Sequence, residues 1–214
     1  MNVNNIQRIA LEIMKRNIIV VIILLAAIAA QAQINSAWTT EEIKHANTAA
    51  TCPYMNQVEK DVVLYNNLAR LFPKKFVRVE LADEPETANV RSLKSELKSM
   101  QPIAALTIHE QETELAQCWA LKSGEKGIVG HKRDGCEPYY LGGIGAENCS
   151  YGKSTGREII LQLLIDEGVS SLGHRKNCLN DKLIAIGVGF ATHKVYDYCC
   201  VMDFTGFEGV NYAK

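Results

Sequence analysis

The chain has 214 residues, of which 47 % are hydrophobic, and a formal net charge of −1. This near-neutral balance argues against a nucleic-acid partner, which a strongly basic surface would indicate. A chain of this length and apolar content typically forms one domain whose core does not depend on disulfides or a metal for folding.

The N-terminus carries the pattern of an export signal. Three basic side chains precede an uncharged apolar run at residues 18–30, and the small residues Ala30 and Ala32 stand at its end. The run is shorter than the roughly 20 residues that cross a bilayer. We therefore predict that residues 1–32 are a signal peptide cut before Gln33, with a retained membrane anchor as the alternative. The mature protein is expected to be secreted, periplasmic or extracellular, without a membrane span.

The cysteines of the exported protein are expected to form disulfides. All seven lie beyond the predicted signal peptide, and an oxidising compartment favours disulfides. No pair has the Cys-x-x-Cys spacing of a zinc site, and the odd number leaves one thiol unpaired. We expect Cys136 to pair with Cys149, because both flank a glycine-rich loop, and Cys178 to pair with Cys199 or Cys200.

Capping signals predict the first two helices. Thr39 and Glu42 have the spacing of a capping box and open a short helix to about Asn47. Asn56 and Glu59 repeat that spacing, and apolar residues then recur at helical spacing until Pro73.

The middle of the chain alternates helices with loops. Residues 82–91 are rich in acidic side chains and predict a surface loop, after which we expect helices at 92–99 and 110–122, the second ended by Gly124. Residues 127–156 lack periodicity and predict a long irregular segment. Thr155 and Glu158 then cap an apolar helix through Ile165 that ends at Gly168.

The C-terminal part changes to a period of two. Apolar residues alternate from Ile184 to Phe190, a turn follows at 191–194, and a second apolar run covers 195–204. This pattern predicts an antiparallel hairpin. Helices followed by a hairpin favour an α+β fold, an α-β-α sandwich in which helices cover both faces of a small antiparallel sheet.

Four polar side chains are the candidates for chemistry. His131 follows Gly130, Glu147 lies in a Gly-Ala-Glu-Asn segment, Glu167 ends the apolar helix, and His174 follows Gly173. Glycine allows close approach of a ligand, and loops on a rigid scaffold often carry sites. Two imidazoles could bind a divalent metal, while two carboxylates could orient them or act as acid and base.

Helical spacing selects between the two neighbouring acids. Glu167 continues the apolar face of the helix, so we expect it to point inward, whereas Asp166 shares a face with Gln162 and Glu158 and is expected in solvent. A carboxylate at the edge of an apolar face needs a partner, so Glu167 predicts a nearby His or Arg.

Each candidate also has an ordinary structural interpretation. His131 lies in a polar loop of the kind that is usually at the surface, and Glu147 could be a capping acid. His174 could begin a helix, and Arg175 could be a structural partner of a carboxylate. The sequence contains neither a Gly-x-Ser-x-Gly elbow nor a phosphate loop, which removes two common enzyme classes.

Several stretches together resemble the CAP superfamily of cysteine-rich secretory, antigen 5 and pathogenesis-related proteins, particularly its bacterial secreted branch. The resemblance covers roughly residues 58–207. It is carried by Asn66-Asn67-Leu68-Ala69-Arg70, Ala116 to Ala120, Gly130-His131, Asp134-Gly135, Gly145-Ala146-Glu147-Asn148, Gly173-His174-Arg175-Lys176-Asn177 and Ile186-Gly187-Val188-Gly189.

The resemblance implies a CAP (SCP) domain at 58–214, preceded by an N-terminal extension at 33–57. It implies an α-β-α sandwich with a cleft lined by two His and two acidic residues. These correspond to His131, Glu147, Glu167 and His174, with Asp166 as the alternative second acid. The two imidazoles would then bind Zn²⁺ or another divalent cation, and Glu147 and Glu167 would be the catalytic groups of any reaction.

Three functions remain open at this stage. The first is a module that binds an unknown extracellular lipid, glycan or protein partner. The second is a metal-dependent, peptidase-like hydrolase, in which Glu147 or Glu167 takes a proton from ion-bound water. The third is a structural cell-surface protein whose cleft has no activity.

Overall fold

The computed structural model describes residues 37–139 and 143–206. The predicted signal peptide lies outside this range. The chain divides into two units after Glu41, and the second, Glu42–Lys214, is described below. In the part of the chain that the structure describes, no helix is long and apolar enough to cross a membrane.

Seven helices and four strands make up the described residues. The helices are α2 (Thr40–Ala46), α3 (Gln57–Leu71), α4 (Pro73–Val79), α5 (Ala88–Ser99), α6 (Glu110–Lys126), α7 (Gly156–Ile165) and α8 (Gly173–Cys178). The strands are β1 (Thr107–Ile108), β2 (Ile144–Tyr151), β3 (Leu183–His193) and β4 (Asp197–Gly206).

The strands form one open sheet in the order β1-β3-β4-β2. β3 pairs antiparallel with β4, β4 pairs antiparallel with β2, and β1 runs parallel to β3. The expected hairpin is therefore confirmed, while the sheet is mixed instead of purely antiparallel. β2 is an edge strand of the described sheet, with β4 as its neighbouring strand.

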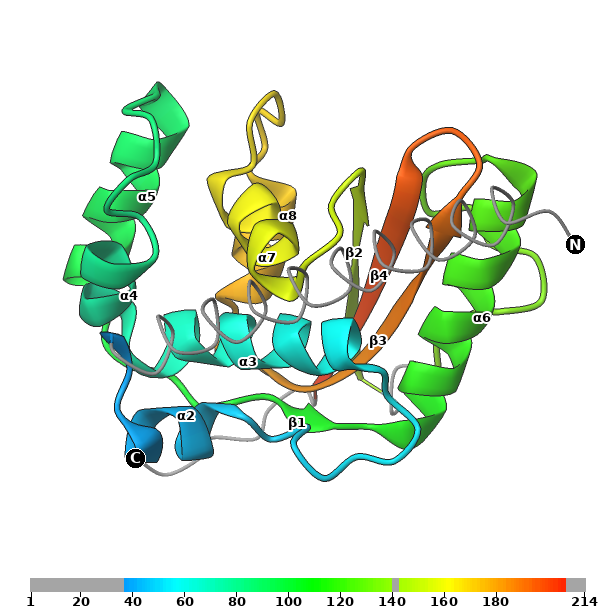
Figure 1. Cartoon of the computed structure of the whole chain (residues 1–214), viewed down its shortest axis with the longest axis horizontal. Helices are drawn as coiled ribbons and strands as arrows, with labels where there is room; N and C mark the ends of the chain where they lie inside the picture. Colours follow the sequence, from blue (N-terminus) through cyan, green and yellow to red (C-terminus); the bar gives the residue numbers. More distant parts are fainter. Residues whose placement is uncertain (1–36, 140–142, 207–214) are drawn as a thin grey trace, which may run out of the picture. The chain divides into compact units, whose positions relative to one another are not determined.

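Helices cover both faces of this sheet, which confirms the expected α+β sandwich (Figure 1). α6 packs on β3 and β4 from one face. α3 packs on β3, and α7 and α8 pack on β2, from the other face. Apolar side chains of β3 and β4, including Ile186, Val188, Met202 and Phe204, are fully buried between the layers.

Local capping explains where the main helices begin. Asn56 and Glu59 form the predicted capping box, in which the Asn56 side chain accepts from the Glu59 amide at 3.1 Å and Glu59 accepts from the Asn56 amide at 2.8 Å. The Thr155 hydroxyl likewise accepts from the Glu158 amide at 3.3 Å and starts α7. These contacts satisfy amides that have no partner within the helix.

Some boundaries differ from the prediction. α5 begins four residues earlier than expected, since Thr87 caps it by accepting from the Val90 amide. α6 continues past Gly124 to Lys126, and Gly127, at φ 68°, is its left-handed cap. Gly124 is instead a packing residue, because a Cβ there would lie 2.1 Å from the Thr192 carbonyl oxygen.

The segment expected to be irregular contains β2. Its sequence, Ile-Gly-Ala-Glu-Asn-Cys-Ser-Tyr, lacks the alternation of apolar and polar residues that marks a half-buried strand. Pairing with β4 along its whole length, from Ile144–Gly206 to Tyr151–Cys199, makes it a strand. Tertiary pairing has therefore overridden weak local preference.

Arg70 joins the helical layer to the sheet. Its buried guanidinium donates to the carbonyl oxygens of Ala104, Cys178, Asn180 and Leu183 at 2.8–3.0 Å. These four carbonyls belong to the segment before β1, the end of α8, the turn after α8 and the start of β3. One side chain of α3 thus sets the positions of three distant segments.

Glycine on β3 lets α6 approach the sheet. A Cβ on Gly187 would lie 2.2 Å from the carbonyl carbon of Glu112, and one on Gly189 would lie 2.3 Å from that of Ala116. Backbone atoms cannot move aside as a flexible side chain can. The two helix turns therefore pack directly on the strand.

We predict that Gly189→Ala destabilises the protein by about 1–3 kcal/mol or more, because the added methyl group overlaps the α6 backbone. Urea denaturation measures the change. Gly173→Ala is the matched control, since a Cβ there would meet its nearest atom at an ordinary 3.5 Å. Equal losses in the two variants would contradict the packing argument.

Candidate functional site

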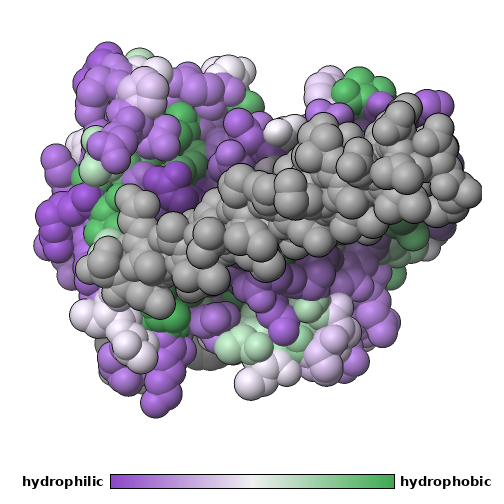
Figure 2. All heavy atoms as spheres, viewed as in Figure 1, coloured by the Kyte–Doolittle hydropathy of each residue, from purple (hydrophilic) through white to green (hydrophobic). Residues whose placement is uncertain are grey.

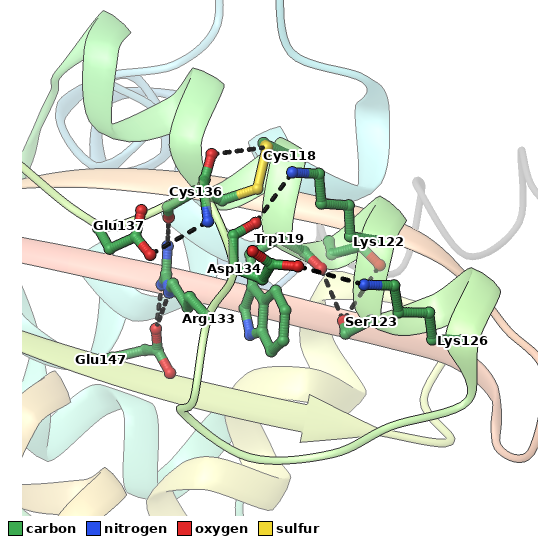
Figure 3. The surroundings of a disulfide bond; sticks show 12 residues. Cys118, Trp119, Lys122, Ser123, Lys126, Arg133, Asp134, Cys136, Glu137 and Glu147 are labelled. Atoms are coloured by element: carbon green, nitrogen blue, oxygen red, sulfur yellow. Dashed lines mark hydrogen bonds and ion pairs between the residues drawn. A yellow bond between two sulfur atoms is a disulfide. The ribbon is translucent and has the colours of Figure 1, made fainter.

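The loop that carries His131 is fastened to α6 and β2. A disulfide joins Cys118 of α6 to Cys136, with Cα atoms 5.8 Å apart, and Lys122 Nζ donates to the Asp134 carbonyl at 2.9 Å (Figure 3). The Gly130 amide donates to the Tyr151 hydroxyl of β2 at 2.9 Å. The disulfide and the Lys122 contact therefore fasten the loop to α6, and the Gly130 contact fastens it to β2.

The expected cysteine pairing is wrong. Cys136 bonds to Cys118, and the other five cysteines are free and buried. Proximity to a glycine-rich loop does not decide a disulfide, which needs Cα atoms within about 4.4–6.8 Å. α6 passes within that range of Cys136, whereas Cys149 lies on β2 and Cys178 in α8, each hydrogen-bonded to a polar group of another residue.

Glu147 is held by an arginine that sequence reasoning missed. Arg133 reaches from the loop to Glu147 on β2, as Figure 3 shows, with Nε 2.5 Å from Oε2. The guanidinium also contacts the Asp203 carboxylate of β4 and donates to the Cys136 carbonyl at 2.8 Å. Burial lowers the pKa of Arg133, but the Asp203 and Glu147 carboxylates outweigh it and raise that pKa overall.

His131, Glu147 and Cys149 come together at β2. The Nδ1 of His131 is hydrogen-bonded to Oε1 of Glu147, and the Cys149 thiol donates to the same oxygen at 3.3 Å. One donor atom from each residue lies within 4.8 Å of the other two. Imidazole nitrogen, carboxylate oxygen and sulfur are the donors that Zn²⁺ takes, so these three residues fit a divalent ion of that kind.

The same group is unlike a nucleophilic triad. In such a triad the acid and the nucleophile bind opposite nitrogens of the imidazole. Here Glu147 contacts Nδ1 of His131, and the sulfur of Cys149 also lies nearest that nitrogen, at 3.9 Å. Burial and the charge of Glu147 raise the pKa of the Cys149 thiol well above its usual value. The arrangement therefore disfavours attack by Cys149.

His174 has its own carboxylate, Asp166. Nδ1 of His174 is 2.7 Å from Oδ1 of Asp166, and Oδ2 accepts from the amides of His174 and Arg175 at 3.0 and 3.3 Å. Asp166 is 3 % exposed, while the His174 side chain is 25 % exposed. One buried acid thus both starts α8 and orients the imidazole.

The expected orientation of the two acids is reversed. Glu167 is exposed in the turn after α7, and Asp166 is buried against His174. The helix ends at Ile165, and Asp166 has a left-handed backbone with φ 57°, so helical spacing no longer applies beyond that point. Asp166, the alternative second acid, is the one paired with a histidine. A catalytic role for Glu147 or Glu167 stays a prediction.

Arg175 is a structural residue. Its buried guanidinium donates to the carbonyl oxygens of Leu164, Asn89 and Ile165 at 2.7–3.1 Å. It also reaches the Ser92 hydroxyl at 2.9 Å and Glu96 at 3.3 Å. These contacts tie α8 to α5 and α7.

Two asparagines connect β2 with α8. Asn148 donates to the His174 carbonyl at 3.0 Å, and Asn177 donates to the Asn148 side chain at 2.8 Å and to the Glu147 carbonyl at 3.3 Å. Since side chains alternate along a strand, Asn148 faces α8 while Glu147 faces the loop. β2 therefore positions both histidines, one from each side.

The histidines line two different hollows. His131, Arg133 and Glu147 line one of about 420 Å³. His174, Asp166 and Glu167 line the other, of about 600 Å³, together with Cys149. Among the described residues, no hydrogen bond or ion pair joins the histidines to each other. Cys149 connects the two places, because it lines the second hollow and bonds to Glu147 of the first.

The sequence around Asp203 could have predicted that this carboxylate has a cationic partner. It is a single acid within the apolar run Cys199 to Phe204, and a carboxylate buried in a strand needs a charged or hydrogen-bonding partner. That rule predicts a nearby cation. It does not say which, because Arg133 is brought to Asp203 only by the fold.

The structure is an α+β sandwich of helices and one sheet, and two histidine–carboxylate pairs lie beside its edge strand β2. The family model "CAP: Cysteine-rich secretory protein family" matches residues 65–204, so the chain belongs to that family.

One similar solved structure is titled "Structure of BmVAL-1". It shares 14 % identity, with 75 % of this chain and 82 % of that chain covered, at a TM-score of 0.43. A search of curated proteins finds no match.

We predict that Asp166→Ala destabilises the protein by about 1–3 kcal/mol, because two buried amides and one imidazole nitrogen lose their acceptor. Glu167→Ala, at the adjacent exposed position, should change stability by less than about 0.5 kcal/mol. Chemical denaturation of both variants tests this. A larger loss in Glu167→Ala would restore the orientation expected from helical spacing.

Proposed function

We propose that this protein is an exported binding module whose cleft lies along β2 and takes a lipid, glycan or protein partner. One observation carries the proposal: residues of β2 line both hollows, and each hollow contains a histidine whose Nδ1 is bound by a carboxylate. Export rests on the N-terminal sequence pattern and on family membership.

The larger hollow has the mixed lining that a ligand with both apolar and polar parts requires. Leu161, Ile165 and Val169 contribute apolar surface, and the charged side chains of the lining include both bases and acids: Lys153, Arg157, Glu84, Glu158, Asp166 and Glu167. Binding sites typically combine apolar walls with a few polar groups that orient the ligand. A lipid and a glycan both combine apolar surface with hydrogen-bonding groups, which suits this lining.

The paired histidines also suit a divalent ion. The carboxylate at Nδ1 of His174 fixes its tautomer and leaves Nε2 as the donor for a metal or ligand, whereas the exposed ring of His131 can turn to present either nitrogen. Among the described residues, Nε2 of His131 and Nε2 of His174 have no hydrogen-bond partner. A bound ion would add a Lewis acid that attracts oxygen atoms of the ligand. Whether one ion joins both histidines stays a prediction.

We predict that Val169→Asp weakens binding by about tenfold, because a charge replaces apolar wall in the larger hollow. The probes are a fluorescent long-chain fatty acid and a fluorescently labelled chito-oligosaccharide, titrated by fluorescence anisotropy. Val195→Asp is the matched control, since Val195 is 63 % exposed in the β3–β4 turn.

Equal affinities of the two aspartate variants for every probe that binds would contradict a ligand site in this hollow. If neither probe binds the unaltered protein, the proposed partner is a protein. Cross-linking from position 169 in the native setting then tests for that partner.

The second candidate is a metal-dependent hydrolase, favoured by the Glu147 carboxylate beside His131 in the smaller hollow. For a binding module we predict no Zn²⁺-dependent hydrolysis of fluorogenic peptide and ester substrates. Turnover that disappears in both His131→Ala and Glu147→Gln would replace the binding module with an enzyme. Glu167→Gln is the control for loss of an exposed carboxylate.

A further inference from the structure

We propose that His131, Glu147 and Cys149 together hold a Zn²⁺ ion, with the Cys149 thiolate as a direct ligand. The inference rests on the proposed cleft and identifies its metal and ligands. It differs from a site shared by His131 and His174, because His174 is not part of this three-residue group.

The placement of the three side chains follows from the fold. Glu147 and Cys149 are two residues apart on β2, so their side chains extend from the same face of the strand. The loop fastened by the Cys118–Cys136 disulfide brings His131 to that face. Three different donor types thus converge on one point without a short sequence motif.

One of the three separations matches a tetrahedral zinc site, and a second is a few tenths of an ångström longer. Zinc bonds of about 2.3 Å to sulfur and about 2.0–2.1 Å to nitrogen or oxygen place neighbouring ligand atoms about 3.3–3.6 Å apart. The sulfur of Cys149 is 3.3 Å from Oε1 of Glu147 and 3.9 Å from Nδ1 of His131.

The third pair, Nδ1 of His131 and Oε1 of Glu147, is in direct hydrogen-bond contact and must separate for an ion to enter. The His131 side chain is 59 % exposed, so the ring has room to turn away from Glu147. Glu147 itself stays in place, because Arg133 holds its other oxygen.

The local charges also favour a cation. The two carboxylates of Glu147 and Asp203 share the single guanidinium of Arg133. When Zn²⁺ binds, the zinc–sulfur bond forms, the S–H bond of Cys149 breaks, and the proton goes to solvent. The two positive charges of the ion then match the thiolate of Cys149 and the carboxylate of Glu147.

The types of ligand atom determine which metal ion the site favours. A thiolate favours Zn²⁺ over Mg²⁺ and Ca²⁺, which prefer oxygen ligands. Three protein ligands leave a fourth coordination position for water or for a ligand group.

The test is calorimetric titration of Zn²⁺ into the mature protein and into single variants. Removing a second-shell partner typically costs 10–100-fold in metal affinity, so loss of a direct ligand in Cys149→Ser should cost about 100-fold or more. Cys52→Ser, which changes another buried free cysteine, should bind as the unaltered protein does. His174→Ala is titrated as well, because His174 lies outside the three-residue group and separates this site from one shared by the two histidines.

Cobalt gives a second measurement that needs no substitution. Co²⁺ bound to the unaltered protein should show the near-ultraviolet charge-transfer band of a thiolate–cobalt bond, and zinc should remove it. This readout applies even if Cys149→Ser does not fold, and the band should persist in Cys52→Ser.

The outcomes separate this proposal from the wider one. Unchanged zinc affinity in Cys149→Ser, or a cobalt complex without the thiolate band, would overturn Cys149 as a ligand. Loss of binding in His131→Ala and His174→Ala with full binding in Cys149→Ser would assign the ion to the two histidines instead. If the unaltered protein binds no zinc, the metal site is wrong, while the fatty-acid and oligosaccharide titrations still decide the binding module independently.

Discussion

The buried guanidinium of Arg70 is the interaction on which the rest of the structure depends. Burial lowers the pKa of Arg70 to about 10, which leaves the group charged at neutral pH. A buried charge is stable only when its hydrogen-bonding capacity is met, and four carbonyl oxygens meet it here. Because these carbonyls include the end of α8, the turn after it and the start of β3, the same contact fixes where the His174 helix meets the sheet.

The edge position of β2 explains why a site forms there. A central strand has a neighbouring strand on each side, whereas β2 pairs with β4 and ends the described sheet. Glu147 and Cys149 extend toward the loop from α6, and Asn148 extends toward α8, so the strand organises polar groups on both sides. On the face that Figure 2 shows, hydrophilic residues predominate with several apolar patches between them, and one patch lies over the β3–β4 hairpin, whose turn carries the exposed Val195 and Tyr196.

Charge pairing inside the site makes it rigid before any ligand arrives. Arg133 bridges Glu147 and Asp203, and Asp166 holds both the backbone and the ring of His174. Only the His131 ring is largely exposed. Pre-organised groups lose little conformational entropy on binding, which suits a cleft that must recognise a partner in solution.

Sequence alone determined the features that depend on neighbouring residues. The caps of α3 and α7, the C-terminal hairpin and the α+β class follow from short-range spacing, because hydrogen bonds within one turn and alternation within one strand are local. The motifs that resemble the CAP family also named His131, Glu147 and His174 as site residues, and the structure gives each histidine a carboxylate partner.

Only the tertiary structure decided the features that join distant parts of the chain. β2 is a strand because β4 pairs with it, and Cys136 bonds to Cys118 because α6 passes beside the loop. Asp166, and not Glu167, is bonded to His174, because the chain leaves the helix at Asp166. The meeting of Cys149 with His131 and Glu147 is of the same kind. Such contacts depend on which segments the packed core brings together, and no local pattern of side chains encodes that choice.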